Sequence, residues 1–166
     1  MFLEKNRKPI EKQQEEHIKN QRSKAHMKKY FVDTCVLRDF YEDRLSKTGR
    51  PLGNYAAEFV LICAQKKYLL ILSETLFWEL KKDYPLKEVE KLLKMLQLII
   101  KIQITKITKE EYVQAKEISK LRKLPLVDCI NAIQSKNHQA TLITRDKHFF
   151  KYLSDIAQVK RPEDII

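Results

Sequence analysis

The sequence predicts an α/β fold in which a central, mainly parallel sheet lies between two layers of helices. The run Tyr-Leu-Leu-Ile-Leu at residues 68–72 has no polar face, which is typical of a parallel strand covered on both sides. A second buried run lies at residues 140–144, and longer segments with apolar residues at helical spacing separate the two runs. Because strands alternate with helices along the chain, we expect a three-layer α/β/α sandwich built from βαβ units.

Five segments have the length and the apolar content of strands. The first, second and fourth are continuous apolar runs, as expected for strands inside a sheet that helices cover on both faces. The third alternates, with Ile102 and Ile104 on one side, which is typical of a strand with one open face. The five expected strands lie at residues 29–33, 68–72, 101–105, 140–144 and 156–159.

Seven segments repeat apolar residues at helical spacing, and several of them begin with residues that cap helices. Asn54 and Ser73 are expected N-caps, and residues 108–111, Thr-Lys-Glu-Glu, form a capping box. Both glycines of the chain lie in a polar loop at residues 44–53, between the first helix and the second. The expected helices lie at residues 34–43, 54–67, 74–82, 86–99, 108–122, 127–137 and 147–153.

The first residues of the chain differ in composition from the rest. Residues 1–27 are rich in Lys, Arg, Gln and Asn and hold few apolar side chains, so this stretch cannot bury enough apolar surface to fold alone. Pro9 and the run after it allow a polar helix. We therefore expect a basic, partly helical N-terminal extension, with a solvated tail as the alternative, followed by a single domain at residues 28–166.

The chain carries a large positive charge. Its net charge of +11 comes from 33 Lys and Arg residues against 22 Asp and Glu residues. A charge of this size favours a polyanionic partner, and nucleic acid is the first candidate. The alternative is a basic protein without such a partner, since richness in Lys and Glu is also typical of proteins from organisms that grow at high temperature.

Neither a membrane nor an exported location is indicated. No apolar run approaches the ~20 residues that a membrane-spanning helix needs. The first 16 residues, MFLEKNRKPIEKQQEE, lack the apolar core of a secretory signal. We therefore expect a cytoplasmic protein that does not bind a membrane.

The cysteines and histidines predict no metal site of their own. Cys35, Cys63 and Cys129 are far apart, lack paired spacing and lie among apolar neighbours, so we expect them to be small packing residues. The histidines form no pair with the spacing of metal ligands, and we expect solvated or packing roles for all four of them: His17, His26, His138 and His148.

Four acids carry the functional hypothesis, because each lies near a junction between a strand and a helix. Asp33 and Asp146 end strands or directly follow them, Glu79 lies in the second turn of a helix that follows a strand, and Asp128 opens a helix. In open parallel sheets, ligands and catalytic groups gather beyond the carboxyl ends of the strands. The sequence therefore predicts that these acids converge on one crevice.

Clustered carboxylates repel one another, so a cation or raised pKa values must hold them together. A set of oxygen ligands without His or Cys favours Mg²⁺ or Mn²⁺ over zinc. Each acid also has a purely structural alternative. Asp33 could end a strand in a turn, Asp128 could be favoured by the helix dipole, Asp146 could be an N-cap, and Glu79 could be an exposed helix acid. Glu74 competes with Glu79, which has the better spacing.

Several residues beside these acids also receive predictions. Arg145 and Lys147 flank Asp146 and are candidate contacts for the phosphate of a nucleic acid, although a charged strand end would have the same sequence. Asp39 and Asp43 are expected at the surface. Asn131 is expected to be a solvated polar residue, with a position facing the pocket as the alternative. Trp78 is expected in the core or at an interface, with a base-stacking role as the alternative.

Four segments resemble the signature segments of PIN-domain ribonucleases, in the order and at the spacing of that family: YFVDTCV, LSETLFWEL, LPLVDCINAI and ATLITRDKHF. The nearest proteins in pattern are VapC-like toxins and related prokaryotic PIN proteins, and the resemblance covers residues 28–166. It implies a metal-dependent endoribonuclease that leaves a 5′-phosphate and a 3′-hydroxyl. It also implies a homodimer, formed through the helices around Phe59 and Leu92.

The resemblance assigns roles residue by residue. It implies that four acids bind Mg²⁺ or Mn²⁺ and act in catalysis, and that a hydroxyl residue supports the first acid and another supports the fourth. The acids are Asp33, Glu79, Asp128 and Asp146, and the hydroxyl residues are Thr34 and Thr144.

Several functions remain open at this point. The chain could be a toxin that pairs with a cognate antitoxin, or a nuclease of RNA maturation that needs none. It could also be an inactive PIN-type module that binds RNA or protein, although the complete set of four acids argues against that. A receiver-like regulatory domain with an acidic Mg²⁺ pocket is disfavoured, because the strand at residues 68–72 ends in Ser73 rather than in an acid.

Overall fold

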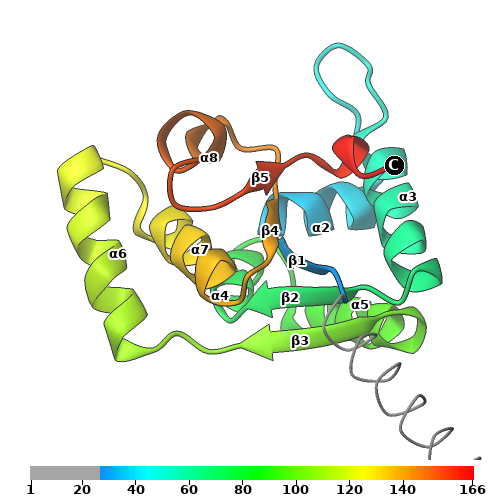
Figure 1. Cartoon of the computed structure of the whole chain (residues 1–166). Helices are drawn as coiled ribbons and strands as arrows, with labels where there is room; N and C mark the ends of the chain where they lie inside the picture. Colours follow the sequence, from blue (N-terminus) through cyan, green and yellow to red (C-terminus); the bar gives the residue numbers. More distant parts are fainter. Residues whose placement is uncertain (1–26) are drawn as a thin grey trace, which may run out of the picture.

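The computed structural model describes residues 27–166, so the expectations for the rest of the N-terminal extension, including those for His17 and His26, lie outside the described residues. Within the described range, five strands form one parallel sheet in the order β3-β2-β1-β4-β5 (Figure 1). The strands are β1 (Lys29–Val32), β2 (Leu69–Ser73), β3 (Lys101–Thr105), β4 (Thr141–Ile143) and β5 (Val159–Lys160). The last strand begins at Val159, three residues later than the sequence predicts.

Helices cover both faces of the sheet, which confirms the expected three-layer sandwich (Figure 1). None of the helices in the described residues is long and apolar enough to cross a bilayer. The helices are α2 (Thr34–Glu42), α3 (Leu52–Gln65), α4 (Thr75–Leu80), α5 (Leu86–Ile99), α6 (Lys109–Arg122), α7 (Leu126–Asn137) and α8 (Lys147–Tyr152), and a short 3₁₀ helix, η1 (Pro162–Asp164), lies near the C-terminus.

Side chains of the central strands alternate between two hydrophobic cores. In β1, Tyr30 and Val32 belong to the first core and Phe31 to the second, and the residues of β2 alternate in the same way. Helices α2, α3, α4 and α5 supply the first core, whereas α6, α7 and α8 supply the second. The strands are buried on both faces, which explains why β1 and β2 are continuous apolar runs in the sequence.

The topology of the sheet changes direction between β1 and β4. The chain runs outward from β1 to β2 and β3, then returns to the other side of β1 for β4 and β5. Val32 pairs with Ile143 in the register of these two strands, and the backbone N–H of Asp33 donates to the carbonyl of Ile143 at 3.0 Å. The residues that follow β1 and β4 therefore emerge side by side at the switch point, where open α/β sheets bind ligands.

The start of α3 differs from the prediction that Asn54 caps this helix. The helix begins at Leu52, with Pro51 in the N-cap position, so Asn54 lies inside the first turn. The backbone N–H of Gly53 donates to the carbonyl of Arg44 at 2.9 Å, and a Cβ atom at Gly53 would collide with Asp43. The close approach between the end of α2 and the start of α3 therefore requires glycine in the first turn.

Candidate metal centre

The four predicted acids lie at the carboxyl edge of the sheet or on the helices that follow it. Asp33 directly follows β1, and Asp146 lies three residues after the end of β4. Glu79 lies in α4, which follows β2, and Asp128 lies in the first turn of α7. The acids are close enough for their charges to interact: the charge of Glu79 acts on Asp33, and those of Asp146 and Asp33 act on Asp128.

Asp33 is the most buried of the four acids, with 8% of the residue exposed. Its Oδ1 accepts a hydrogen bond from the backbone N–H of Thr34 at 2.9 Å, which caps α2. Its Oδ2 accepts from the hydroxyl of Thr144 at 2.7 Å and from the thiol of Cys35 at 3.1 Å. Burial raises the pKa of Asp33 and the charge of Glu79 adds to this rise, while the hydrogen bonds oppose it.

Two hydroxyl groups connect these acids to one another. The hydroxyl of Thr34 donates to Oε2 of Glu79 at 2.5 Å, so the residue that follows Asp33 orients the glutamate on α4. The hydroxyl of Thr144 donates to Asp33 and also accepts from the backbone N–H of Asp146 at 3.0 Å. We call Asp33, Thr34, Glu79 and Thr144 the inner half of the site.

A second group of side chains, which we call the outer half, consists of Asp128, Asp146 and His148. Oδ2 of Asp128 lies 3.3 Å from Nδ1 of His148, and Oδ1 of Asp146 lies 3.6 Å from the same nitrogen. The side chains are 14%, 40% and 46% exposed, respectively. Burial raises the pKa of Asp128 to about 6, the charges of Asp146 and Asp33 contribute to the rise, and His148 opposes it.

The donor set fits a divalent cation. Each residue of the outer half offers one ligand atom, and the three atoms lie within 4.8 Å of one another. A bound cation would offset the repulsion between these carboxylates, which raises their pKa values. Carboxylate oxygens are also the ligands that hard divalent ions prefer. The sequence did not predict the imidazole of His148 in this cluster, because its partner Asp128 lies twenty residues earlier and on another helix.

Arg145 has a different environment from the one expected of a nucleic-acid contact. Its Nε lies 2.7 Å from Oδ2 of Asp39, and its Nη1 lies 2.6 Å from Oε2 of Glu163, with 14% of the side chain exposed. The guanidinium also lies over the ring of Tyr55. These contacts join the segment after β4 to α2, α3 and η1. They also occupy guanidinium N–H groups of Arg145 that would otherwise donate to a phosphate. Lys147 is exposed, as the prediction requires.

Two residues that the sequence predicts at the surface are buried. Asp39 is 2% exposed because it is paired with Arg145, and Asn131 is 2% exposed because its Oδ1 accepts a hydrogen bond from the hydroxyl of Thr75 at 2.9 Å. Both predictions are therefore wrong, and in both cases the partner is distant in sequence. The bond between Asn131 and Thr75 joins α7, which carries Asp128, to the first turn of α4, which carries Glu79.

Cys35 combines a packing role with a place in the site. It packs against the first core as expected, but its thiol also contacts Asp33 and lies 3.5 Å from the hydroxyl of Thr144. Cys63 and Cys129 are buried, as predicted. Trp78 is 47% exposed, which excludes a position in the core, while the predicted interface position and its base-stacking alternative stay predictions.

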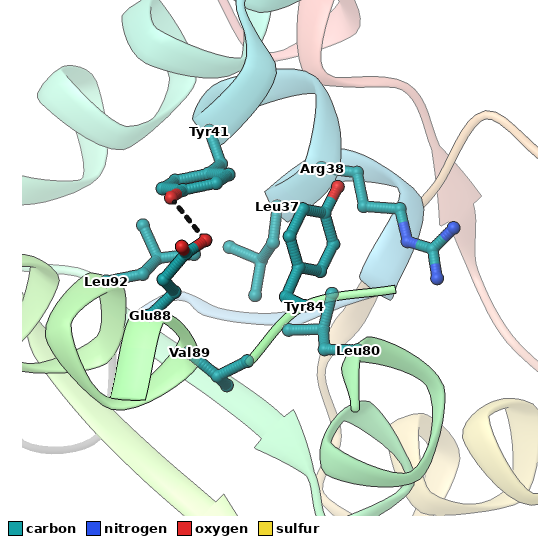
Figure 2. Close-up of a pocket in the computed structure, with 8 residues that line it drawn as sticks. All are labelled: Leu37, Arg38, Tyr41, Leu80, Tyr84, Glu88, Val89 and Leu92. Carbon is teal, nitrogen blue, oxygen red and sulfur yellow. Dashed lines mark hydrogen bonds between the residues drawn. The ribbon is translucent and has the colours of Figure 1, made fainter. Parts of the chain in front are cut away.

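A hollow near α4 is too small to be the functional site. It lies between α2, the end of α4 and the start of α5, and Figure 2 shows the eight side chains that line it. In it, the hydroxyl of Tyr41 donates to Oε2 of Glu88 at 3.0 Å (Figure 2). Its volume of about 10 Å³ leaves room for about one water molecule, and none of the four acids lines it.

Comparisons with solved structures find the same fold in proteins of low sequence identity. A toxin–antitoxin complex from Klebsiella pneumoniae contains a chain that is 19% identical, with a TM-score of 0.55, covering 80% of this chain and 97% of that one. VapBC2 from Rickettsia felis, bound to a DNA fragment from its promoter, contains a chain that is 13% identical, with a TM-score of 0.57, covering 80% and 98%. No curated protein matches the sequence.

The family comparison covers the elements that carry all four acids. The family model described as PIN domain matches residues 30–153, from β1 to the end of α8. This range is most of the chain, and it agrees with the parallel sheet and with the fold shared with the two solved structures. The chain therefore belongs to the PIN-domain family, whose members are generally nucleases.

Proposed function

We propose that this chain is an endoribonuclease that uses Mg²⁺ or Mn²⁺ to hydrolyse phosphodiester bonds of RNA. The observation that carries the proposal is the gathering of four acids at the switch point of a PIN-domain sheet. A bound divalent ion activates water for attack on phosphorus and offsets the charge of the transition state. The residues that would hold the ion are Asp33, Glu79, Asp128 and Asp146.

The residues around the acids would preorganise them for this task. The hydroxyl of Thr144 fixes one oxygen of Asp33 and the start of α8 together, and that of Thr34 orients Glu79. These contacts are formed inside the protein, so the carboxylates need little rearrangement when a ligand arrives. Asp128, with a pKa of about 6, must lose its proton before it can bind a cation.

RNA as the substrate is supported by the net charge of +11, which favours a polyanion, and by the resemblance of the sequence to ribonucleases. Lys147 is exposed at the start of α8, beside Asp146, and would contact a phosphate near the metal. Arg145, which the sequence predicts as a second contact, is left out of this proposal because its guanidinium is held in ion pairs with Asp39 and Glu163. The cytoplasmic location expected from the sequence stays a prediction.

The experiment that tests this proposal is cleavage of RNA by the purified chain with Mn²⁺, compared between wild type, Asp33→Asn and Asp128→Asn. The matched control is Asp43→Asn, which makes the same change at an exposed acid beyond the other end of α2. We expect cleavage by wild type and control to stop on chelation, and each site variant to lose it. RNA binding without cleavage, unchanged by either site variant, would support an inactive binding module instead.

A toxin role is the more specific hypothesis. It is supported by the likeness of the fold to a chain of a toxin–antitoxin complex from Klebsiella pneumoniae, while a nuclease of RNA maturation remains the alternative. A toxin would arrest growth when the wild-type chain is expressed alone in bacteria, and Asp33→Asn would not. A cognate antitoxin, encoded by a small neighbouring gene, would restore growth. Wild-type expression without arrest would favour maturation.

A homodimer is proposed through α3 and α5. Phe59 and Leu92, which marked these helices in the sequence, are themselves buried in the first core, so the contact would use exposed apolar neighbours. These are Leu61, Met95, Leu98 and Ile99. In sedimentation experiments we expect Leu98→Asp to give monomers and Leu121→Asp, at an equally exposed leucine on α6, to stay dimeric. A monomeric wild type would contradict this.

A further inference from the structure

We propose that Nδ1 of His148 is a direct ligand of the metal ion, beside the carboxylates of Asp128 and Asp146, and that the site therefore prefers Mn²⁺, Co²⁺ or Zn²⁺ to Mg²⁺. The inference rests on the proposed function, which it extends by adding one ligand and a metal preference. It also replaces the all-oxygen ligand set that the sequence predicts. The carrying observation is that one imidazole nitrogen lies close to both acids at once.

The distance from the imidazole nitrogen to each of the two acids is close to that between two ligands of one ion. Two ligand atoms about 2.1 Å from the same ion lie about 3.0 Å apart at a right angle and about 3.4 Å apart at the tetrahedral angle. Nδ1 of His148 lies 3.3 Å from the Asp128 oxygen and 3.6 Å from the Asp146 oxygen. All three ligand atoms lie within 4.8 Å of one another, so one ion placed between them is within reach of each after small side-chain movements.

The fold holds the imidazole in place through its backbone and its neighbours. Asp146 caps α8, and its Oδ1 accepts the backbone N–H of His148 at 2.9 Å, so the acid and the histidine share one helical turn. The next residue, Phe149, is 1% exposed and anchors α8 in the second core. Asp128 approaches from α7, which is in contact with α8 (Figure 1). The site is thus built from two helices that the core holds together.

The chemistry of the donor set decides the metal preference. Mg²⁺ prefers oxygen ligands and retains several waters, whereas imidazole suits the transition metals. For nitrogen-containing sites, affinity generally rises from Mn²⁺ through Co²⁺, while Zn²⁺ also binds imidazole strongly. With 46% of its side chain exposed, His148 is accessible to a metal ion from solvent. An all-oxygen site would lack this gain in affinity.

The competing account is that His148 only donates a hydrogen bond to Asp128, without contacting a metal. In that case removal of the imidazole would weaken all divalent ions to a similar degree, because only the orientation of one carboxylate changes. If His148 is a ligand, removal would weaken Co²⁺ and Zn²⁺ much more than Mg²⁺. The two accounts therefore differ in metal selectivity and in the presence of a metal–nitrogen bond.

The test uses the full chain, free of any histidine tag, loaded with Mn²⁺ and studied by pulsed electron paramagnetic resonance. We expect a ¹⁴N coupling from one imidazole in wild type and its loss in His148→Ala and His148→Asp. His138→Ala is the matched control, because that imidazole contacts Thr105 and lies outside the acid cluster. The control should keep the coupling.

Calorimetric titrations with Zn²⁺, Co²⁺ and Mg²⁺ give an independent readout. We expect His148→Ala to lose about 10–100-fold in affinity for Zn²⁺ and Co²⁺, and about threefold or less for Mg²⁺. His148→Asp should shift the preference back towards Mg²⁺. A wild type without the nitrogen coupling, or a coupling that persists in His148→Ala, would overturn the inference and leave the nuclease proposal intact. Failure of Mn²⁺ to bind at the acids would overturn both.

Discussion

The inner and outer halves of the site meet at the same edge of the sheet but differ in how they are held. In the inner half, Asp33 is buried and receives hydrogen bonds from Thr34, Thr144 and Cys35. In the outer half, Asp146 and His148 are largely open to solvent, and Oδ2 of Asp128 meets an imidazole instead of a hydroxyl or an amide. The inner half is thus preformed by the fold, whereas the outer half leaves ligand positions open for a metal ion and its substrate.

Thr144 is the residue at which the two halves meet, so its replacement gives the largest expected effect. Thr144→Val removes the hydroxyl that bonds both Asp33 and the backbone of Asp146, in a residue that is fully buried. We expect RNA cleavage to fall by about 100-fold, equivalent to about 3 kcal/mol, and the free energy of unfolding to fall by about 1–3 kcal/mol. Cleavage rates and urea denaturation measure the two effects.

The matched control for this prediction is Thr141→Val, at the start of β4, the strand that Thr144 directly follows. Its hydroxyl bonds Gln158 at an exposed position, away from the acids. We expect a change of about 0.5 kcal/mol or less in the free energy of unfolding and no change in cleavage. Equal effects of the two replacements on cleavage would show that the Thr144 hydroxyl has no special role in RNA cleavage, contrary to our inference.

The segment after β4 repeats the comparison on a smaller scale, because Arg145 is held in ion pairs and Lys147 is exposed. Arg145→Met would leave the buried Asp39 with only the longer ion pair to Arg44, at 3.7 Å, and we expect the free energy of unfolding to fall by about 2–3 kcal/mol. Lys147→Met should leave stability unchanged and weaken RNA binding, with a lower dependence on salt. Thermal unfolding and RNA binding at two salt concentrations test both. Weaker RNA binding by a folded Arg145→Met would restore the original prediction for this residue.

The smallest expected effect concerns Asp128, the more buried of the two acids in the outer half. Because burial raises the pKa of Asp128 from 3.8 to about 6, the metal-free fold gains stability as the pH falls through this range, and the ionised group costs stability at pH 7. After allowance for solvent screening, we expect Asp128→Asn to raise the free energy of unfolding at pH 7 by about 1–2 kcal/mol. Urea denaturation in the presence of a chelator measures this change.

The difference from wild type should shrink as the pH falls towards 4 and vanish below 3.8, the pKa of the carboxyl in the unfolded chain. Asp43→Asn, the same change at an exposed acid, is the matched control. If Asp128→Asn has the same unfolding free energy as wild type at both pH values, burial does not strain this carboxylate and the contrast between the two halves is weaker than we infer.

The parts of this architecture that depend on local pattern could be predicted from the sequence. Continuous apolar runs predicted the inner parallel strands. Asp33 and Asp146 could be placed near strand ends because Asp33 closes the first run and Asp146 lies just beyond the fourth. The capping box at Thr108 was also predicted and is present. The convergence of the strand ends follows from parallel pairing, which a sheet of βαβ units requires.

The parts that depend on contacts between distant segments could not be predicted. Arg145 pairs with Asp39, which lies 106 residues earlier, and Asn131 bonds Thr75, which lies 56 residues earlier. No local sequence pattern distinguishes these buried polar groups from solvated ones. Their burial costs free energy unless a partner forms a hydrogen bond or an ion pair with them, and that partner is distant in sequence. His148 was missed for the same reason, because it meets Asp128 only when α8 packs against α7.

The central claim is that acids from both halves bind one divalent ion. The most direct test is an anomalous diffraction map of crystals of the full chain grown with Mn²⁺. The account predicts a manganese peak within ligand distance of Asp33 from the inner half and of Asp128 or Asp146 from the outer half. A map with manganese elsewhere, or with no peak between these carboxylates at saturating Mn²⁺, would contradict it.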